Sequence, residues 1–212
     1  MTLSRTSPAR KSDRYVEGEA HLHRLVEDSL VAHVAYVRDG QPMIIPTGVA
    51  HEPGALLVHG STGAGWLRSL ATGTPVAVSI TALDGVVVAR SAFESSMRYR
   101  SAVVFGRAEP LEGSAKEAAL ETLTDTLIPG RVPEVRPSTA KELAATLVVR
   151  IVIEDVTFKD NHDAWPEDPP EDVETDAWAG VLPRLTTYGA PLPAPDLRTG
   201  IAVPASVRAL AE

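Results

Sequence analysis

The stretch "ALDGVVVARSAFESSMRYRSAVVFG", residues 82–106, combines two apolar runs with an unusually polar connection. The runs at 86–89 and 101–105 are rich in valine, as strands are. A hairpin needs only a turn between its strands, yet this connection holds Arg90, Ser91, Ser95, Ser96, Arg98, Tyr99, Arg100 and Ser101. Arginine is costly to bury without a partner, so Arg90 and Arg100 at the strand ends predict either carboxylate pairs or a bound anion.

The regions around this stretch predict a mainly β protein with flanking helices. Apolar runs at 30–37, 41–50, 55–61, 74–83, 86–92 and 99–111 are separated by short connections, with Asp39-Gly40 and Asp84-Gly85 as turns. Tight antiparallel connections favour a closed sheet, because closure removes exposed strand edges. A last strand is predicted at 146–159, and its "RIVIEDV" alternates apolar and polar residues.

Four helices are predicted beside the strands. Residues 17–29 place Leu22, Leu25 and Val26 at helical spacing, and "GAGWLRSLATG" has the glycine boundaries of a short helix. Two more follow at 114–128, with Ser114 as N-cap, and at 138–146, with Ser138 or Thr139 as cap.

Composition indicates a soluble globular chain with one core. The 212 residues are 44% hydrophobic and 23% charged, and they include no cysteine, which excludes disulfides, zinc–thiolate sites, iron–sulfur clusters and cysteine nucleophiles. The net charge of -8 resides mainly in segment 154–176, so no basic footprint for nucleic acid is present. The sequence lacks an apolar membrane span or signal peptide, and we expect a cytoplasmic protein. We expect a flexible arm at 1–16, a barrel domain at 17–160, and an irregular, acidic and proline-rich extension at 161–212 that wraps the barrel.

The segment "VHGSTGAGWLR" is the best candidate for anion binding. It joins a strand to a helix and combines His59, two hydroxyls and three glycines with Arg68, which suits a phosphate. The spacings of nucleoside-triphosphate loops and Rossmann loops are missing, as are the motifs of hydrolytic triads and zinc proteases. His33 is predicted to lie in the core, whereas His21 and His23 are predicted to lie on the surface without a shared metal.

Residues 32–111 resemble the pyridoxamine 5'-phosphate oxidase-like, FMN-binding split-barrel family, in the flavin-nucleotide-binding branch that includes nitroimidazole-resistance-like proteins. The markers are "DGQP", "VHGS", "LDGVVVARSAF", "SMRYRSAVVFG", "PGR" and "WAGVLP", and the resemblance extends from about residue 17 to Trp178. It implies a six-stranded antiparallel split barrel that forms a homodimer with two FMN sites at the subunit interface.

The resemblance also implies where FMN binds. The isoalloxazine would lie along residues 44–49 and the phosphate near the strand–helix junction, while polar residues from later strands complete the site. The implied contacts are Pro46, Thr47, Gly48 and Val49 for the ring, His59, Gly60, Ser61, Thr62 and Arg68 for the phosphate, and Arg100, Ser101, Lys159 and Trp178 around them.

The chain departs from its relatives at 94–101, where many branch members read "HHSMNYRS". We therefore place a small organic substrate near Glu94, Arg98 and Tyr99, with Tyr99 as proton donor, and expect an FMN-dependent oxidoreductase that does not oxidise pyridoxamine phosphate. Two alternatives stay open. One is a non-catalytic carrier or sensor for flavin, deazaflavin or haem, and the other is a barrel without cofactor that acts through its dimer surface. Haem ligands would come from His33, His51, His59 or His162.

Overall fold

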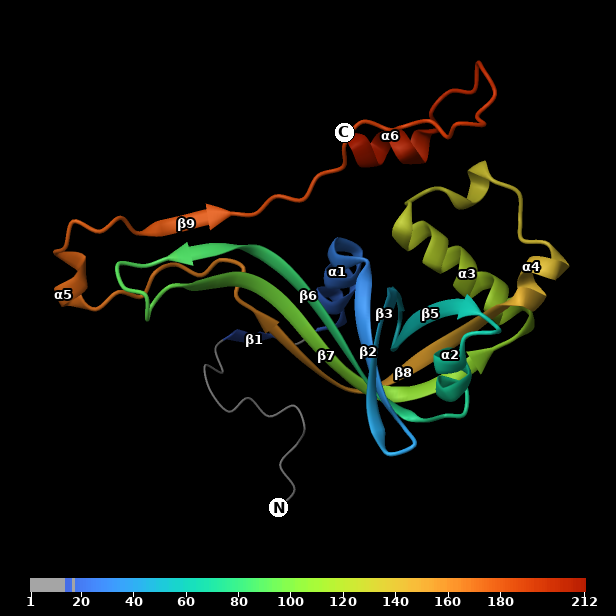
Figure 1. The fold of residues 1–212 in the computed structure, drawn as a ribbon, viewed down its shortest axis with the longest axis horizontal. Coiled ribbons are helices and arrows are strands. Elements are labelled where there is room, and N and C mark those ends of the chain that lie inside the picture. The colour runs from blue at the N-terminus through green and yellow to red at the C-terminus, as the bar shows by residue number, and fades with distance from the viewer. Residues whose placement is uncertain (1–13, 17) are drawn as a thin grey trace.

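The computed structural model describes residues 14–16 and 18–212, and antiparallel strands dominate it (Figure 1). The strands are β1 (Tyr15–Val16), β2 (Val31–Arg38), β3 (Gln41–Gly48), β4 (Ala50–Glu52), β5 (Ala55–Ser61), β6 (Pro75–Val88), β7 (Ser96–Leu111), β8 (Thr146–Asp160) and β9 (Gly180–Pro183). Their order is β3-β2-β6-β7-β8-β5-β4, with β1 paired to β8 and β9 paired to β6. The predicted mainly β fold is therefore confirmed.

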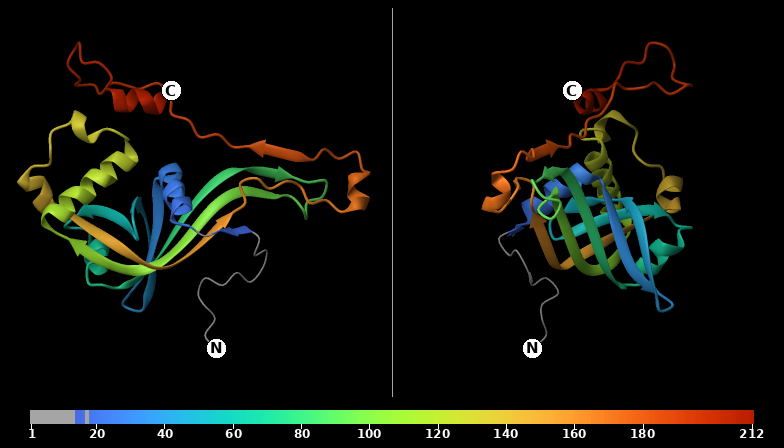
Figure 2. Two further views of the ribbon diagram at one scale, coloured as in Figure 1. Left: turned by 180° about the vertical axis from the view of Figure 1, so that it is seen from behind. Right: turned by 60° about the vertical axis from the view of Figure 1, so that its left-hand side comes forward.

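The sheet is strongly curved, as the right-hand view of Figure 2 shows, and its strands contribute to the larger of two apolar clusters. Alternate residues of the long strands point inward, so that Val78 and Ile80 of β6 are fully buried with Val104 of β7. Helix α1 (Glu19–Ser29) adds Leu25 and Val26 to the same cluster, as its helical spacing predicts. The sheet begins at β3 and ends at β4, strands that follow one another in the chain, as expected for a split barrel.

The remaining helices lie mostly at one end of the barrel. They are α2 (Gly65–Leu70), α3 (Gly113–Leu127), the 3-10 turn η2 (Val132–Glu134), α4 (Ala140–Ala145), α5 (Pro170–Val173) and α6 (Ala205–Ala211). The predicted cap at Thr139 is confirmed, because it forms a capping box with Glu142. The predicted cap at Ser114 is wrong: α3 begins at Gly113 after Glu112, and Gly113 turns the chain with a φ of 55°.

The predicted turn at Asp84-Gly85 is also wrong. Strand β6 continues through this dipeptide with a register shift between Leu83 and Gly85, which marks a bulge. Glycine is needed there for another reason: a Cβ on Gly85 would lie 2.7 Å from the carbonyl oxygen of Leu182 in β9. The connection to β7 therefore lies at 89–95, and Arg98, Tyr99 and Arg100 belong to the strand itself.

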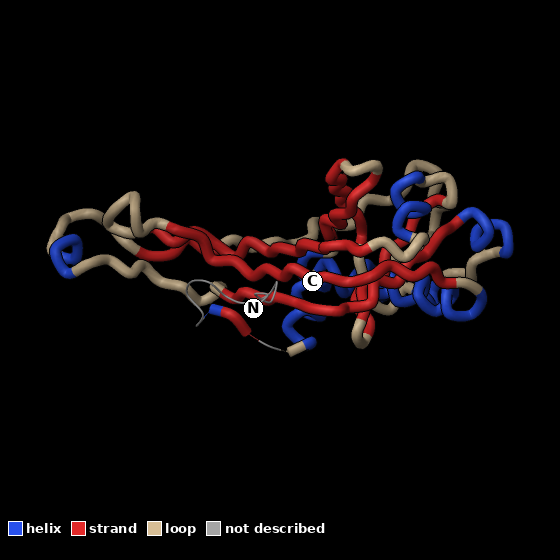
Figure 3. The backbone as a smooth tube through the Cα atoms, turned by 90° about the horizontal axis from the view of Figure 1, so that it is seen from below, coloured by secondary structure: helices blue, strands red, loops and turns tan. Residues whose placement is uncertain are grey.

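The outer parts of β6 and β7 extend well beyond the barrel as a two-stranded arm, here called the β6–β7 arm and comprising residues 83–100 (Figure 3). After β8 and α5, the chain forms β9, which pairs with β6 in the arm. It then runs back along the molecule to α6, which lies near α3 (Figure 1). Ser206 of α6 donates a hydrogen bond to Glu134. Within 161–212, regular structure is limited to α5, β9 and α6.

The predicted flexible arm at 1–16 falls largely outside the described residues. Its described part includes β1, in which Tyr15 pairs with Lys159. Among the helices of the described chain, none is long and apolar enough to cross a membrane.

Candidate functional site

The predicted phosphate segment lies where β5 ends and α2 begins. Ser61 Oγ accepts a hydrogen bond from the Gly63 amide at 3.1 Å, and the Thr62 amide donates to the Ala145 carbonyl at 3.0 Å. Gly60 permits close packing of α2, since a Cβ there would lie 2.8 Å from Leu67 Cδ1. These contacts hold the hydroxyls of the segment at the protein surface in a defined turn.

Two guanidinium groups converge on this turn. A Cβ on Gly65 would lie 4.0 Å from both Arg38 Nη1 and Arg68 Nη2, so both side chains border the same glycine. Arg68 also donates to the Thr62 carbonyl at 3.3 Å. In the described part of the chain, neither arginine forms an ion pair with a carboxylate. The pair is therefore a cationic site with unused charge.

Sequence reasoning missed Arg38. It ends β2 directly before the Asp39-Gly40 turn, and "RDG" indicated only that turn. A signal was available, because the β2–β3 hairpin and the β5–α2 junction both end at one side of the predicted barrel. However, the pairing of strands does not by itself show that the tip of the β2–β3 hairpin, which carries Arg38, approaches the start of α2.

The predicted ring-binding strand is β3, at one end of the sheet order. Its partner is β2, in which His33 pairs with Pro46 and Ala32 with Thr47. The opposite edge of β3 pairs with no other strand of the described sheet. Residues 44, 46 and 48 are exposed, whereas Val49 is buried just after the strand. The strand thus offers free backbone groups along an edge that a planar heterocycle could meet.

His59 lies in β5, within the predicted phosphate segment, and pairs with Val148 of β8. Its side chain reaches the surface, but burial by the surrounding protein lowers the pKa of His59 below its ordinary value. The neutral imidazole is therefore favoured at physiological pH, and it can donate one hydrogen bond and accept another.

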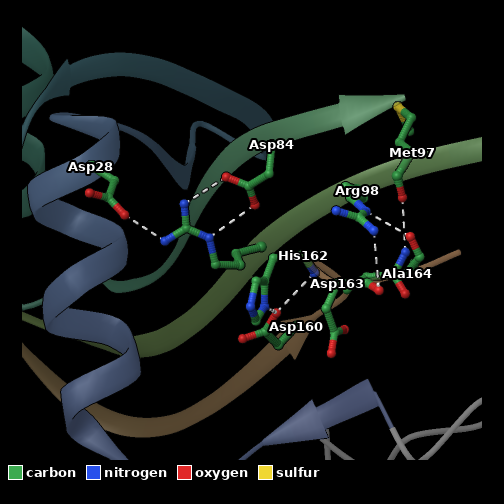
Figure 4. A network of polar contacts seen from close by, with 10 residues as sticks. Asp28, Asp84, Met97, Arg98, Asp160, His162, Asp163 and Ala164 are labelled. Atoms are coloured by element: carbon green, nitrogen blue, oxygen red, sulfur yellow. Dashed lines mark hydrogen bonds and ion pairs between the residues drawn. The ribbon is translucent and has the colours of Figure 1, made fainter. Parts of the chain in front are cut away.

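Arg100 forms the centre of an ion-pair cluster at the base of the β6–β7 arm (Figure 4). Its Nε and Nη2 donate to Asp84 at 3.0 and 2.7 Å, and its Nη1 donates to Asp28 of α1 at 2.5 Å. The hydrogen bonds that Arg100 donates to Asp84 are the main reason why the pKa of Arg100 is raised. Arg90 similarly binds Asp168, which is buried to 2% exposure. Of the two readings that the sequence left open for these arginines, the structure has carboxylate pairs.

The other predicted residues of the arm contact the segment after β8. Arg98 donates from Nε to the Ala164 carbonyl at 2.7 Å and lies over the Trp165 ring, 5.0 Å from its centroid. Lys159 Nζ lies 5.2 Å from the centre of the Tyr99 ring, and Ser101 is the register partner of Lys159. These residues therefore form one continuous cluster.

Glu94 and Trp178 lie farther out. Glu94 lines a small cavity of about 170 Å³ with Phe93, Ser96 and Trp165 at the end of the arm. Trp178 is 68% exposed and lies against Gly180, just before β9.

The predicted residues thus fall into two sets at opposite ends of β8. Thr146, its first residue, pairs with Ser61 of the phosphate segment, and Asp160, its last, pairs with Arg100 of the arm. An extended strand rises about 3.3 Å per residue, so 15 residues separate the two ends by up to roughly 45 Å. One chain therefore does not bring both sets into a single pocket.

A cavity of about 300 Å³ lies between α1 and the end of β8. It is lined by His21, Arg24, Asp84, Arg100, Phe158, Asp160 and His162. A second cavity of about 550 Å³ shares Asp84 and Arg100 with it and extends toward Tyr188 of the C-terminal segment. This space could not be predicted from sequence, because its walls come from α1, β6, β7 and the end of β8.

Two pairs of histidines share a neighbourhood: His23 and His51 lie ring to ring, and His21 and His162 line the same cavity. His33 is exposed on β2, so its predicted core position is wrong. Its neighbours Ala32 and Val34 are the buried residues at this point of the strand. His51 is nearly buried, with Nε2 3.2 Å from Glu19 and its ring 5.3 Å from that of His23. Burial chiefly lowers the pKa of His51. No cluster of three metal-ligating side chains occurs among residues 14–16 and 18–212.

Comparison with known proteins places this geometry in a family. The family model described as pyridoxamine 5'-phosphate oxidase matches residues 18–160. The FAD and haem binding protein from Mycobacterium smegmatis is 49% identical, with a TM-score of 0.89 over 93% of this chain and 97% of that one. The flavocytochrome Anf3 from Azotobacter vinelandii is 29% identical, with a TM-score of 0.87 over 97% and 96% of the two chains.

A more distant structure, a putative 5-nitroimidazole antibiotic resistance protein from Bacteroides thetaiotaomicron, shares the fold at 18% identity and a TM-score of 0.57, over 68% of this chain and 85% of that one. No curated protein matches the sequence. Because the family model covers more than half of the residues, the chain belongs to the pyridoxamine 5'-phosphate oxidase-like split-barrel family.

Proposed function

We propose that the protein is a homodimeric redox protein that binds a flavin and haem. The observation that carries the flavin part is the convergence of Arg38 and Arg68 on the turn at Gly65, where neither has a carboxylate partner among residues 14–16 and 18–212. Two free guanidinium groups beside Ser61 and Thr62 suit a phosphate, which accepts charge-assisted hydrogen bonds from both.

The residues present also suit the rest of a flavin. The free edge of β3 offers backbone groups to the polar edge of the ring at Pro46, Thr47 and Gly48, with Val49 closing the strand. His59 and Gly60 border the phosphate turn. The sequence predicted FMN, whereas the related mycobacterial protein is described as binding FAD, and this supports FAD as the flavin here.

A second subunit would complete the site. The phosphate set and the arm set lie at opposite ends of β8, so a flavin bound at one set meets the other only if that set comes from a second copy. The β6–β7 arm projects away from its own barrel (Figure 3), which supports contact with a neighbouring subunit. In the proposed dimer, Ser101, Lys159 and Trp178 of one subunit border the flavin of its partner.

The arm would then shape the pocket for a small organic substrate. Arg98 is held by the Ala164 carbonyl and Trp165, Glu94 faces a small cavity, and the Tyr99 hydroxyl is the proposed proton donor. When bound, a flavin exchanges two electrons as hydride with an organic molecule and haem iron exchanges one, so the pair links both kinds of redox partner. The chain's own residues bind, orient and shield these groups.

The haem part of the proposal is supported by two relatives, one described as an FAD and haem binding protein and the other as a flavocytochrome. The structure offers a histidine with a carboxylate partner, His162, on a cavity wall. This combination favours a protein with both cofactors over a flavoprotein without haem.

The flavin part is tested by measuring the affinity of the purified protein for FAD and FMN in Arg38→Ala and Arg68→Ala variants. Each charge-assisted contact contributes about 1.5–3 kcal/mol, so we expect each change to weaken binding roughly ten- to a hundredfold. Arg107→Ala is the matched control, because Arg107 is exposed on β7 and pairs with Glu154. Unchanged flavin affinity in both variants would rule out this phosphate site.

A further inference from the structure

We propose that His162 is the protein ligand of the haem iron, in the cavity between α1 and the end of β8. This inference rests on the proposed function, since it assumes that the chain binds haem. It adds the ligand, the side of the fold on which the haem lies, and a residue that positions the ligand.

The His162 side chain is held in one orientation by the residue two positions before it. Asp160 Oδ1 lies 2.6 Å from His162 Nδ1 and accepts a second hydrogen bond, of 3.1 Å, from the His162 amide (Figure 4). The carboxylate oxygen that accepts from the His162 amide is also the one that faces Nδ1, so it acts as an acceptor and Nδ1 carries the proton.

This arrangement leaves Nε2 of His162 with a free lone pair. Histidines that bind metals commonly donate their other ring N–H to a carboxylate, which fixes the tautomer and strengthens the ligand. His162 therefore has the bonding pattern of a metal ligand before any metal is present. It lies two residues after Asp160, the last residue of β8, whose position is fixed by the pairing of Asp160 with Arg100 of β7.

The walls of the cavity suit a haem as well. Phe158 and His21 provide a ring surface, with their centroids 5.4 Å apart, and Arg24 provides a positive charge. Arg24 forms no ion pair with any carboxylate in the described part of the chain, so it is free to meet a propionate. The adjoining cavity of about 550 Å³, which shares Asp84 and Arg100, provides room beyond the first.

The other histidines considered from sequence lack this combination. His33 is exposed on β2, and His59 is exposed at the end of β5, next to the proposed flavin phosphate. His51 is only 6% exposed, and its Nε2 already faces Glu19 at 3.2 Å. His162 joins an oriented ring to a cavity wall.

The test compares haem content and absorption and electron paramagnetic resonance spectra of the full-length protein with those of variants reconstituted with haemin. We expect His162→Ala to lower haem affinity at least about tenfold and to change the iron spectrum, with recovery on addition of imidazole. His162→Met keeps a ligand of similar reach, and we expect it to retain haem with an altered ligand signature. Asp160→Asn should weaken haem binding roughly ten- to a hundredfold without losing the histidine signature.

His33→Ala is the matched control and should leave both the haem content and the spectrum unchanged. Wild-type spectra in His162→Ala and His162→Met would overturn the assignment of His162 and leave the proposed function intact. A wild-type protein that takes up flavin but no haemin would overturn both the assignment and the haem part of the proposed function.

Discussion

Substitution of Arg100 distinguishes a structural role from a cofactor-binding role. The sequence predicts that Arg100 contacts the flavin, but its guanidinium donates two hydrogen bonds to Asp84 and one to Asp28. These bonds tie β7 to β6 and to α1. We therefore expect Arg100→Ala to reduce the stability of the protein more than its affinity for flavin.

The magnitude follows from the exposure of the partners. The Asp84 side chain is 22% exposed, so solvent screens its two charge-assisted hydrogen bonds only slightly and they stabilise the folded state. The Asp28 side chain is 51% exposed, so its ion pair adds little to stability. Together they predict a loss of about 2–4 kcal/mol in the free energy of unfolding. Arg107→Ala on the same strand removes a pair whose partners are 58% and 40% exposed, and should cost about 0–1 kcal/mol.

Urea unfolding followed by circular dichroism measures both changes. The slope of the unfolding free energy against urea concentration should stay the same, which would show that the substitution changed stability alone. Flavin titration of the same preparations measures affinity. The reasoning is refuted if Arg100→Ala unfolds no earlier than Arg107→Ala while its flavin affinity falls tenfold or more. That result would assign Arg100 to the cofactor and make its ion pairs incidental.

Three further predictions concern other parts of the fold. Gly106→Ala would place a Cβ 2.1 Å from the Val152 carbonyl oxygen, so urea unfolding should show a loss of about 3 kcal/mol, against little change for Gly48→Ala, where nothing lies within 4 Å. Asp168→Asn weakens the buried contact with Arg90 and should cost about 1.5–3 kcal/mol in the same assay; wild-type stability would show that the contact is dispensable. The hydroxyl and amide of Ser206 lower the pKa of Glu134, so the contact that holds α6 is present above the carboxylate's ordinary pKa of 4.5 and is lost as pH falls through the lower, folded value. The protection factors of the α6 amides, which are corrected for the intrinsic pH dependence of exchange, should fall in that acid range. Protection factors that stay constant with pH would contradict the prediction.

Much of the fold follows from local sequence patterns. Helix α1, α2 and the capped start of α4 lie where apolar spacing, glycines and Thr139 place them. These elements depend on contacts between residues near in sequence, and such contacts leave regular signals. The family resemblance added the barrel topology, which local patterns alone do not fix.

The errors arise where a local signal competes with a distant contact. Asp84-Gly85 has the composition of a turn, but β9 approaches Gly85 from almost 100 residues away and Asp84 is needed by Arg100, so β6 continues. His33 lies in an apolar run, yet strand alternation directs it outward between Ala32 and Val34. A single sequence does not show which partner a strand residue meets across the sheet.

The candidate site was predictable in part for the same reason. The phosphate segment near Arg68 is contiguous in sequence and could be found, whereas Arg38 reaches it from another hairpin. His162 was one of four histidines with equal standing in the sequence. Only the fold shows that Asp160 orients its ring and that α1 closes a cavity over it.

The central claim is that one chain binds both a flavin and haem, and the absorption spectrum of the purified protein, with cofactor content per chain after reconstitution with FAD and haemin, tests it most directly. We predict a flavin band and a Soret band in the same preparation, each corresponding to about one cofactor per chain. A colourless protein that takes up neither cofactor would contradict the account.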